Sequence, residues 1–188
     1  MTASNSRTPL PFLIIGTILL GALIFFPLPT AATQPTLRLG NEYRLRLYHL
    51  HTKESLDVVY RVGDAYLPAA EDRLDHFLRD HRTGDVIALR PALFDLLHDL
   101  TKALGRDEAE IDIVCGYRTQ FSNEFLRRTS SGVAQNSRHM SGEAIDIRIP
   151  GVPTARLRDA ALALHRGGVG YYPESQFVHV DVGPVRRW

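Results

Sequence analysis

The sequence has little of several features that would point to common classes of function. Its 188 residues include one cysteine, Cys115, so the chain cannot form an internal disulfide. Basic and acidic residues nearly balance, with 22 Lys and Arg against 21 Asp and Glu. No basic cluster stands out that would bind nucleic acid or an anionic membrane surface, and no internal repeat is present. The length and the 44% of hydrophobic residues predict one domain with a real core.

Charge is also nearly missing from the first 32 residues, in which Arg7 is the one charged side chain. After it, Leu10–Leu28 is almost wholly apolar, and Thr30 and Ala32 provide small residues at the −3 and −1 positions of a cleavage site. Residues 1–32 are therefore predicted to be a secretory signal peptide. The alternative is an uncleaved membrane anchor through residues 10–28, because about 19 apolar residues can just span a bilayer. Either alternative exports the rest of the chain, and without an Arg-Arg pair a twin-arginine route is not supported.

Residues 33–188 contain both strand-like and helix-like patterns. Period-two runs predict a hairpin over 37–47 and 56–62, and further strands over 111–115, 144–149, 169–172 and 177–182. Helical spacing predicts helices over 68–82, 91–104, 120–128 and 153–166. We interpret His49 and His51 at the hairpin tip as solvated turn residues. Because helices and strands do not alternate regularly, the pattern favours a single α+β domain with a central antiparallel sheet and flanking helices.

Two separate stretches carry candidate metal ligands. His139 and Asp146 lie seven positions apart, and Gly142 between them allows a tight turn. His179 and Asp181 are two positions apart on a predicted strand, so both side chains project from one face. Two imidazoles and one carboxylate are a common ligand set for catalytic zinc, with the fourth position left to water. The pattern thus indicates a zinc (Zn²⁺) site made by His139, Asp146 and His179, against the alternative of a loop histidine and a satisfied polar pair.

The motif around these residues resembles that of a known enzyme family. The spacing Ser137-x-His139-x-x-Gly142-x-Ala144-x-Asp146 is similar to the metal motif of the zinc peptidases that include D-alanyl-D-alanine carboxypeptidases and dipeptidases. The chain resembles the murein endopeptidase K branch of that family more closely, over essentially all of residues 33–188. The stretches that match this branch are Leu50 to Ser55, His76 to Asp80, Gly167 to Pro173, and Phe177 to Pro184 with Trp188. The segment Gly116 to Thr119 resembles the larger zinc peptidase family.

The resemblance implies an α+β zinc peptidase built on an antiparallel sheet, with His139, Asp146 and His179 as ligands. It implies a periplasmic or envelope location and peptidoglycan as the partner, with hydrolysis of the peptide cross-links between stem peptides next to diaminopimelate. The alternatives are a D-Ala-D-Ala-type carboxypeptidase and a non-catalytic peptidoglycan-binding module. The sequence does not indicate the oligomeric state.

The chain departs from the family where carboxypeptidase relatives place their general base. That position, three residues before the last zinc histidine, is Gln176 here, which cannot accept a proton. The candidate bases are therefore Asp181, Glu174 and Glu143. Asp181 is favoured because it shares a strand face with His179, and the alternative is that it orients a ligand.

Five further residues are assigned provisional roles. Arg118 is predicted to stabilise the oxyanion or a substrate carboxylate, or else to form a structural salt bridge. Ser137 is predicted to hydrogen-bond the stem peptide or to shape its loop, and Tyr171, with Tyr172, to line the cleft or to pack in the core. Cys115 is interpreted as a buried apolar residue, because no flanking residue suggests a base that would activate its thiol.

Overall fold

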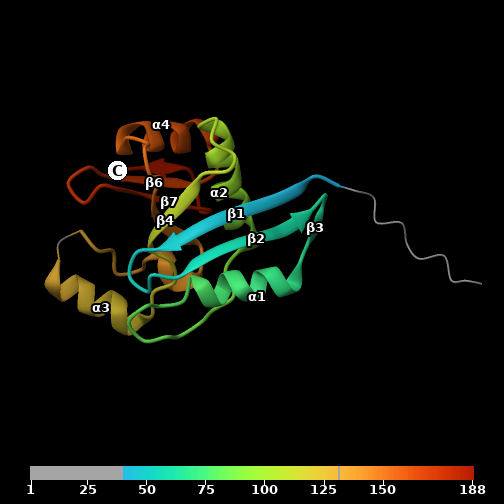
Figure 1. Ribbon diagram of the computed structural model, residues 1–188. Coiled ribbons are helices and arrows are strands. Elements are labelled where there is room, and N and C mark those ends of the chain that lie inside the picture. Colours follow the sequence, from blue (N-terminus) through green and yellow to red (C-terminus); the bar gives the residue numbers. More distant parts are fainter. Residues whose placement is uncertain (1–39, 131) are drawn as a thin grey trace, which may run out of the picture. The chain divides into compact units, whose positions relative to one another are not determined.

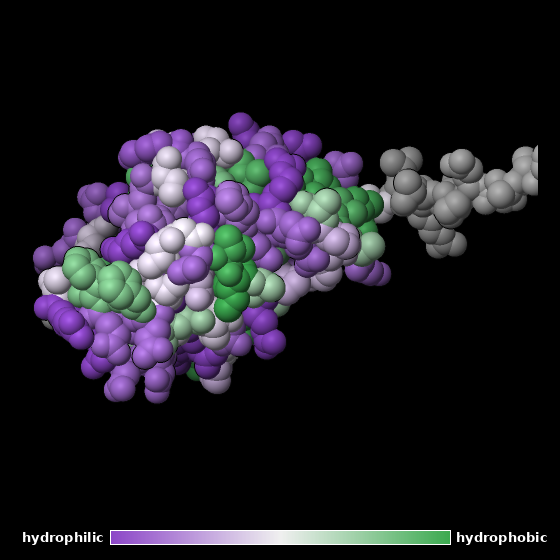
Figure 2. All heavy atoms as spheres, turned by 90° about the horizontal axis from the view of Figure 1, so that it is seen from below, coloured by the Kyte–Doolittle hydropathy of each residue, from purple (hydrophilic) through white to green (hydrophobic). Residues whose placement is uncertain are grey.

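The computed structural model describes residues 40–130 and 132–188, which belong to one compact unit, Leu37–Trp188. The predicted signal or anchor segment, residues 1–32, lies outside the described residues. Within the described ranges, no helix is both long and apolar enough to cross a membrane. One face of the molecule is mostly polar, with small apolar patches between the polar residues (Figure 2).

The N-terminal hairpin forms as its alternating pattern predicts. Strands β1 (Glu42–His49) and β2 (Ser55–Val62) pair antiparallel, and every second side chain enters the core, as Leu45 and Leu47 do. The interpretation of His49 as a solvated turn residue is wrong. Its side chain is fully buried, its Nδ1 accepts hydrogen bonds from the backbone N–H groups of His51 and Thr52, and its ring packs edge-on against Phe77.

The described strands form one eight-stranded sheet in the order β3-β2-β1-β4-β5-β7-β6-β8 (Figure 1). The remaining strands are β3 (Ala65–Tyr66), β4 (Glu110–Cys115), β5 (Ala144–Arg148), β6 (Gly168–Tyr172), β7 (Phe177–Asp181) and β8 (Arg186–Arg187). The prediction of an antiparallel sheet needs correction, because β1 pairs with β4 and β6 with β8 in parallel. A parallel pair needs a long crossover, and the segment that carries the first two helices provides it for β1 and β4. The sheet is therefore mixed and the fold is α+β.

The helices are α1 (Pro68–Phe77), α2 (Pro91–Ala103), α3 (Gln120–Thr129) and α4 (Thr154–Leu164). Helices α1, α2 and α4 pack on the sheet, with α4 against β6 and β7 (Figure 1). Both α1 and α2 begin with a proline, whose fixed φ suits the first helical position. Helix α1 ends at Phe77, five residues before the predicted end, and the chain then turns toward the second helix.

The central strands present opposite chemistry on their two faces. Ile145 and Ile147 of β5, and Val178 and Val180 of β7, are buried in the core with the packed helices. Asp146 of β5 and His179 of β7, at alternate positions of the same strands, face the other side of the sheet. Period-two alternation therefore separates the hydrophobic core from a polar site on the same strands.

Candidate metal centre

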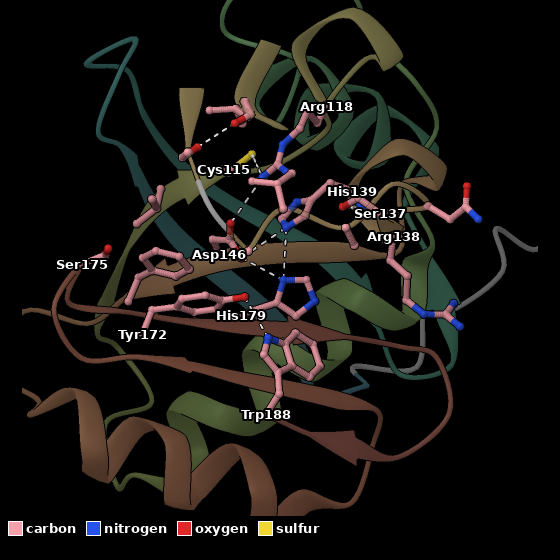
Figure 3. A pocket seen from close by; sticks show the side chains of 18 of the residues that line it. Cys115, Arg118, Ser137, Arg138, His139, Asp146, Tyr172, Ser175, His179 and Trp188 are labelled. Carbon is pink, nitrogen blue, oxygen red and sulfur yellow. Dashed lines mark hydrogen bonds and ion pairs between the residues drawn. The ribbon is translucent and has the colours of Figure 1, made fainter. Parts of the chain in front are cut away.

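Three polar side chains meet at the polar face of the central strands. Nε2 of His139 lies 3.2 Å from Oδ1 of Asp146 and 3.1 Å from Nδ1 of His179, and that Nδ1 lies 2.9 Å from the same Asp146 oxygen. His139 is on the short 3-10 helix η1 (Arg138–Ser141), whereas Asp146 and His179 are cross-strand partners on β5 and β7. All three side chains are buried and point toward one another (Figure 3).

Local structure places His139 beside the strands. Ser137 caps η1, and its hydroxyl accepts a hydrogen bond from the backbone N–H of His139 at 3.4 Å. Gly142 ends the helix with φ +66°, a left-handed conformation that favours glycine. A side chain at Gly142 would also press on the backbone carbonyl of Ala88, at 3.1 Å. The Ser137-to-Gly142 motif is therefore a turn that places the His139 imidazole beside the sheet.

Hydrogen bonds on the far side of each ring fix which nitrogen faces the cluster. Nδ1 of His139 lies 2.8 Å from the carbonyl oxygen of Gly116, so this nitrogen carries the proton and donates it. Nε2 of His179 lies 3.1 Å from Oδ2 of Asp181 and donates in the same way. When both rings are neutral, the nitrogens that face Asp146 are therefore the unprotonated ones, which can bind a metal ion. Metal-binding histidines are typically oriented by such outer partners.

The donor set fits a divalent cation with an open position. Ligand atoms around a tetrahedral zinc, with bonds of about 2.0–2.2 Å, lie about 3.3–3.6 Å apart. The three atoms of His139, Asp146 and His179 are 2.9–3.2 Å apart, so a small shift would place them on one face of such a tetrahedron. They also line a cleft of about 570 Å³, from which a substrate could reach the fourth position.

The electrostatics of the cluster favour a cation between its members. Although burial acts to lower it, the Asp146 carboxylate raises the pKa of His139 to about 10. Burial acts to raise the pKa of Asp146, but His139 and His179 hold it far below its usual range. A buried carboxylate needs positive charge beside it. In the metal-free protein a proton on His139 provides that charge, and a metal ion would replace the proton.

Cys115 is buried, as predicted, but it lies at this site and not in the hydrophobic core with Ile111 and Ile113 of β4. Its pairing with Asp146 follows a register shift after Ile113, and such a bulge moves a side chain to the other face of a strand. The thiol is buried, lies 3.3 Å from a guanidinium nitrogen of Arg118, and forms with His139 and Asp146 a group whose potential ligand atoms lie within 4.8 Å of one another. The potential ligand atoms of His139, Asp146 and His179 lie closer together, within 3.2 Å of one another. Burial acts to raise the pKa of Cys115, but His139 and Arg118 hold it below its ordinary value.

Asp181 does not face the cleft. Its side chain is fully buried, and beyond His179 it accepts hydrogen bonds from the backbone N–H groups of Gly168 and Gly183. Arg186 binds both of its oxygens, at 3.0 and 2.6 Å. Burial acts to raise the pKa of Asp181, but His179 and Arg186 hold it well below its usual range. A carboxylate whose oxygens are fully engaged suits the orientation of His179 and not the uptake of a proton from water.

The two other candidate bases do not line the cleft either. Glu143 is engaged by Arg138 at 2.5 Å, and Glu174 is exposed in the turn before β7. Among the described residues that line the cleft, Asp146 is the one carboxylate.

The position of Arg118 is compatible with both of its predicted roles, stabilisation of substrate charge and a structural salt bridge. Its side chain is buried, lines the cleft, and places one guanidinium nitrogen 3.6 Å from Oδ2 of Asp146. Asn123 of α3 accepts from its other terminal nitrogen at 3.3 Å and donates to the carbonyl groups of Ala134 and Gln135. Sequence reasoning missed Asn123, because only the fold shows that this amide joins α3, a loop and the arginine.

The structure places Ser137 and Tyr172 in the lining of the cleft, but not Tyr171. Tyr171 packs against the core, and Arg158 stacks on its ring at 4.5 Å. Because β6 alternates, Tyr172 shares its face with Gly170, which pairs with His179. Of the two tyrosines predicted to line the cleft, Tyr172 does so and Tyr171 does not. Trp188, a second cleft residue that had no predicted role, donates from its indole to the Tyr172 hydroxyl at 2.8 Å (Figure 3).

A buried His/Asp/His cluster that opens to a cleft is the arrangement expected of a hydrolytic metalloenzyme. The family described as "Peptidoglycan L,D-endopeptidase MepK" matches residues 39–188, and the chain belongs to this family. The chain is 41% identical over 176 residues to the peptidoglycan L,D-endopeptidase MepK of Escherichia coli K12, covering 94% of each protein. It is 44% identical over 144 residues to the probable peptidoglycan L,D-endopeptidase MepK of Haemophilus influenzae, covering 77% of each. No solved structure matches the chain.

Proposed function

We propose that this peptidase is a zinc-dependent murein endopeptidase, which hydrolyses peptide cross-links between peptidoglycan stem peptides at a bridge that contains diaminopimelate. The observation that carries the zinc assignment is the convergence of His139, Asp146 and His179 within 3.2 Å of one another on the wall of a cleft. Membership of the peptidoglycan L,D-endopeptidase family supports the substrate class.

The zinc ion and the two residues beside its ligands, Arg118 and Asp181, would each have a distinct role. Zinc, when bound by these three side chains, would polarise the scissile carbonyl and lower the pKa of a water molecule to about 7. Arg118, beside Asp146 in the cleft, would stabilise the negative charge that develops on the carbonyl oxygen. Asp181 would hold the Nε2–H of His179 and so direct its Nδ1 into the site.

The location that we propose is the periplasm or cell envelope. The peptide cross-links lie outside the cytoplasm, and the apolar residues 10–28 behind Arg7 have the composition of an export signal or an anchor. We assign residues 1–32 to that segment and residues 33–188 to the metallopeptidase domain.

The experiment is a metal titration of the full chain with purified muropeptide dimers as substrate. Activity should disappear in excess chelator and return with stoichiometric zinc. His139→Ala should abolish both zinc binding and hydrolysis, because it removes one of three ligands. His76→Ala is the matched control, since His76 is exposed on α1 and does not line the cleft. Hydrolysis that survives His139→Ala would refute the zinc site.

Product masses identify the bond that is cut. Bridge cleavage converts a dimer into two monomers, whereas a carboxypeptidase removes one alanine from a monomeric stem. Binding to murein sacculi without release of soluble muropeptides would show a non-catalytic module. Dimers linked through D-alanine and through diaminopimelate should be offered separately, so that the preferred bridge is read directly.

A further inference from the structure

The end of the sheet next to His179 is built around two glycines and two C-terminal side chains. Gly168 and Gly170 lie on β6, and β8 brings Arg186 and Trp188 alongside them. A side chain on Gly168 would overlap with Asp181 and with the Arg186 guanidinium, and one on Gly170 would meet the Trp188 indole at 2.7 Å. The glycine-rich stretch Gly167 to Gly170 thus leaves room for these two side chains.

Both C-terminal side chains act on His179. Arg186 binds both oxygens of Asp181, and Asp181 accepts the Nε2–H of His179 at 3.1 Å. The Trp188 indole lies 5.2 Å from the His179 ring, between centroids, at an angle of 51°, beside His179 in the cleft (Figure 3).

The indole is itself fixed in place. Its Nε1–H donates to the Tyr172 hydroxyl, and the Trp188 backbone N–H donates to the carbonyl of Val169 at 3.2 Å. The Trp188 carbonyl accepts from the backbone N–H of Tyr171. The ring that flanks His179 is therefore held by both its side chain and its backbone.

We propose that Gly168, Gly170, Arg186 and Trp188 form a clamp, here called the β8 clamp, that holds His179 with Nδ1 turned toward the metal. Arg186 fixes the carboxylate that defines the tautomer of His179, and Trp188 limits the rotation of the ring. Arg186 and Trp188 are positioning residues, and the inference rests on the metal site of the proposed function. The β8 clamp gives a role to the Gly167–Pro173 stretch and to Trp188, which the chemistry of the cluster alone leaves unexplained.

The test is the dissociation constant for zinc, measured by competition with a chromophoric chelator and without substrate. Outer partners of metal ligands typically change metal affinity by about 10–100-fold. Arg186→Gln should weaken zinc binding within that range, and Arg186→Lys should recover part of the loss because it keeps the charge beside Asp181. Gly170→Ala should weaken zinc binding by displacing the indole, although it alters no polar group.

Arg187→Gln is the matched control. Arg187 is the neighbouring residue of β8, is exposed, and has no ion pair among the described residues. It should bind zinc as the parent chain does. Zinc affinity equal to that of the parent in both Arg186→Gln and Gly170→Ala would overturn the β8 clamp. Equal losses in Arg186→Gln and Arg187→Gln would overturn it as well, because they would show a general effect of charge or stability.

A milder variant covers the case in which Arg186→Gln does not fold, as judged by circular dichroism without metal. Trp188→Phe keeps an aromatic ring but loses the hydrogen bond to Tyr172, and it should weaken zinc binding severalfold with the fold intact. Unchanged zinc affinity in Trp188→Phe and Gly170→Ala would then overturn the proposal. A chain that depends on the β8 clamp for zinc but cuts no muropeptide would refute only the murein assignment. A chain that cuts murein with unchanged zinc affinity in these variants would refute only the β8 clamp.

Discussion

Nε2 of His139 and Nδ1 of His179 lie 3.1 Å apart, and both face the same oxygen of Asp146. Two imidazole nitrogens this close are compatible only if a proton or a metal ion lies between them and the carboxylate. The outer hydrogen bonds of both rings, to Gly116 and Asp181, leave these inner nitrogens free to share that ion. Proton and metal therefore compete for one place, which makes the pH dependence of zinc binding informative.

Zinc binding should release about two protons at pH 8, one from His139 and one from a zinc-bound water whose pKa is about 7. Asp146 raises the pKa of His139 to about 10 in the metal-free protein, so this ring is protonated at pH 8 and must lose its proton to become a ligand. Loss of the His139 proton alone should contribute about a tenfold rise in zinc affinity per pH unit, up to about pH 10. Calorimetry in buffers of different ionisation enthalpy measures the released protons, and release of one proton or fewer would contradict the predicted state of His139.

The raised pKa of His139 also predicts how the stability of the metal-free protein depends on pH. Because the pKa of His139 is higher in the folded state than its ordinary value of 6.5, the protonated ring favours folding below pH 6.5, and this contribution is lost as the pH rises through about 10. Urea denaturation of His139→Gln against the parent should therefore show a difference that shrinks between pH 7 and pH 10.

Cobalt should bind through nitrogen and oxygen and not through sulfur. Cys115 lies close enough to His139 and Asp146 to compete for a metal, but the triangle that includes His179 is tighter. The cobalt-substituted protein should lack the intense near-ultraviolet band of thiolate-to-cobalt charge transfer, and Cys115→Ser should leave its visible spectrum unchanged. A charge-transfer band that disappears in Cys115→Ser would show that the thiol is a ligand.

Periodicity predicted the parts of the fold that depend on local sequence. Alternation predicted strands over 144–149 and 177–182, and the structure confirms both, with Ile145 and Val178 buried in the core. It could not predict the register shift that turns Cys115 toward Asp146, because a bulge depends on the partner strand. The same limit explains why β8, a strand of two residues held by non-local pairing, had no signal in the sequence.

The candidate site was also predicted from the sequence only in part. Residue types and spacing were enough to propose His139, Asp146 and His179 together, because a metal ligand set is a matter of chemistry. The roles of the surrounding residues needed the fold. Nothing in the sequence showed that Arg186 forms an ion pair with Asp181. Nor did it show that Tyr172 of β6, and not Tyr171, faces the cleft.

Asp80 should be important for stability although it lies outside the metal cluster. It is buried after α1, and its carboxylate accepts hydrogen bonds from the backbone N–H and the hydroxyl of Thr119, at 2.8 and 2.7 Å, and from the backbone N–H of Arg82. Asp80→Asn places an amide donor against these donors and should cost about 1–3 kcal/mol of unfolding free energy. Urea denaturation of the parent and of Asp80→Asn measures this loss of unfolding free energy. Asp85→Asn, at an exposed position of the same loop, is the control.

The contribution of Asp80 should also depend on acid pH. Burial acts to raise its pKa, but hydrogen bonds from Thr119 and Arg82 hold the pKa of Asp80 at about 2. A lowered pKa stabilises the folded state above the ordinary value of 3.8, and the stabilisation is lost as the pH falls toward 2. The difference between the parent and Asp80→Asn should therefore narrow between pH 4 and pH 2, and a difference that widens there would contradict the assignment.

Arg118→Gln should slow hydrolysis while the protein keeps its zinc. The guanidinium lies in the cleft 3.6 Å from the outer oxygen of Asp146, where it can stabilise charge that develops on a carbonyl. Loss of one such group typically costs about 10²–10³-fold in kcat. Steady-state kinetics on muropeptide dimers and the zinc content should be measured together, with Arg127→Gln on the exposed side of α3 as control. If zinc is lost along with activity, Arg118 serves mainly to hold Asp146, and if neither changes, its role is that of a structural ion pair.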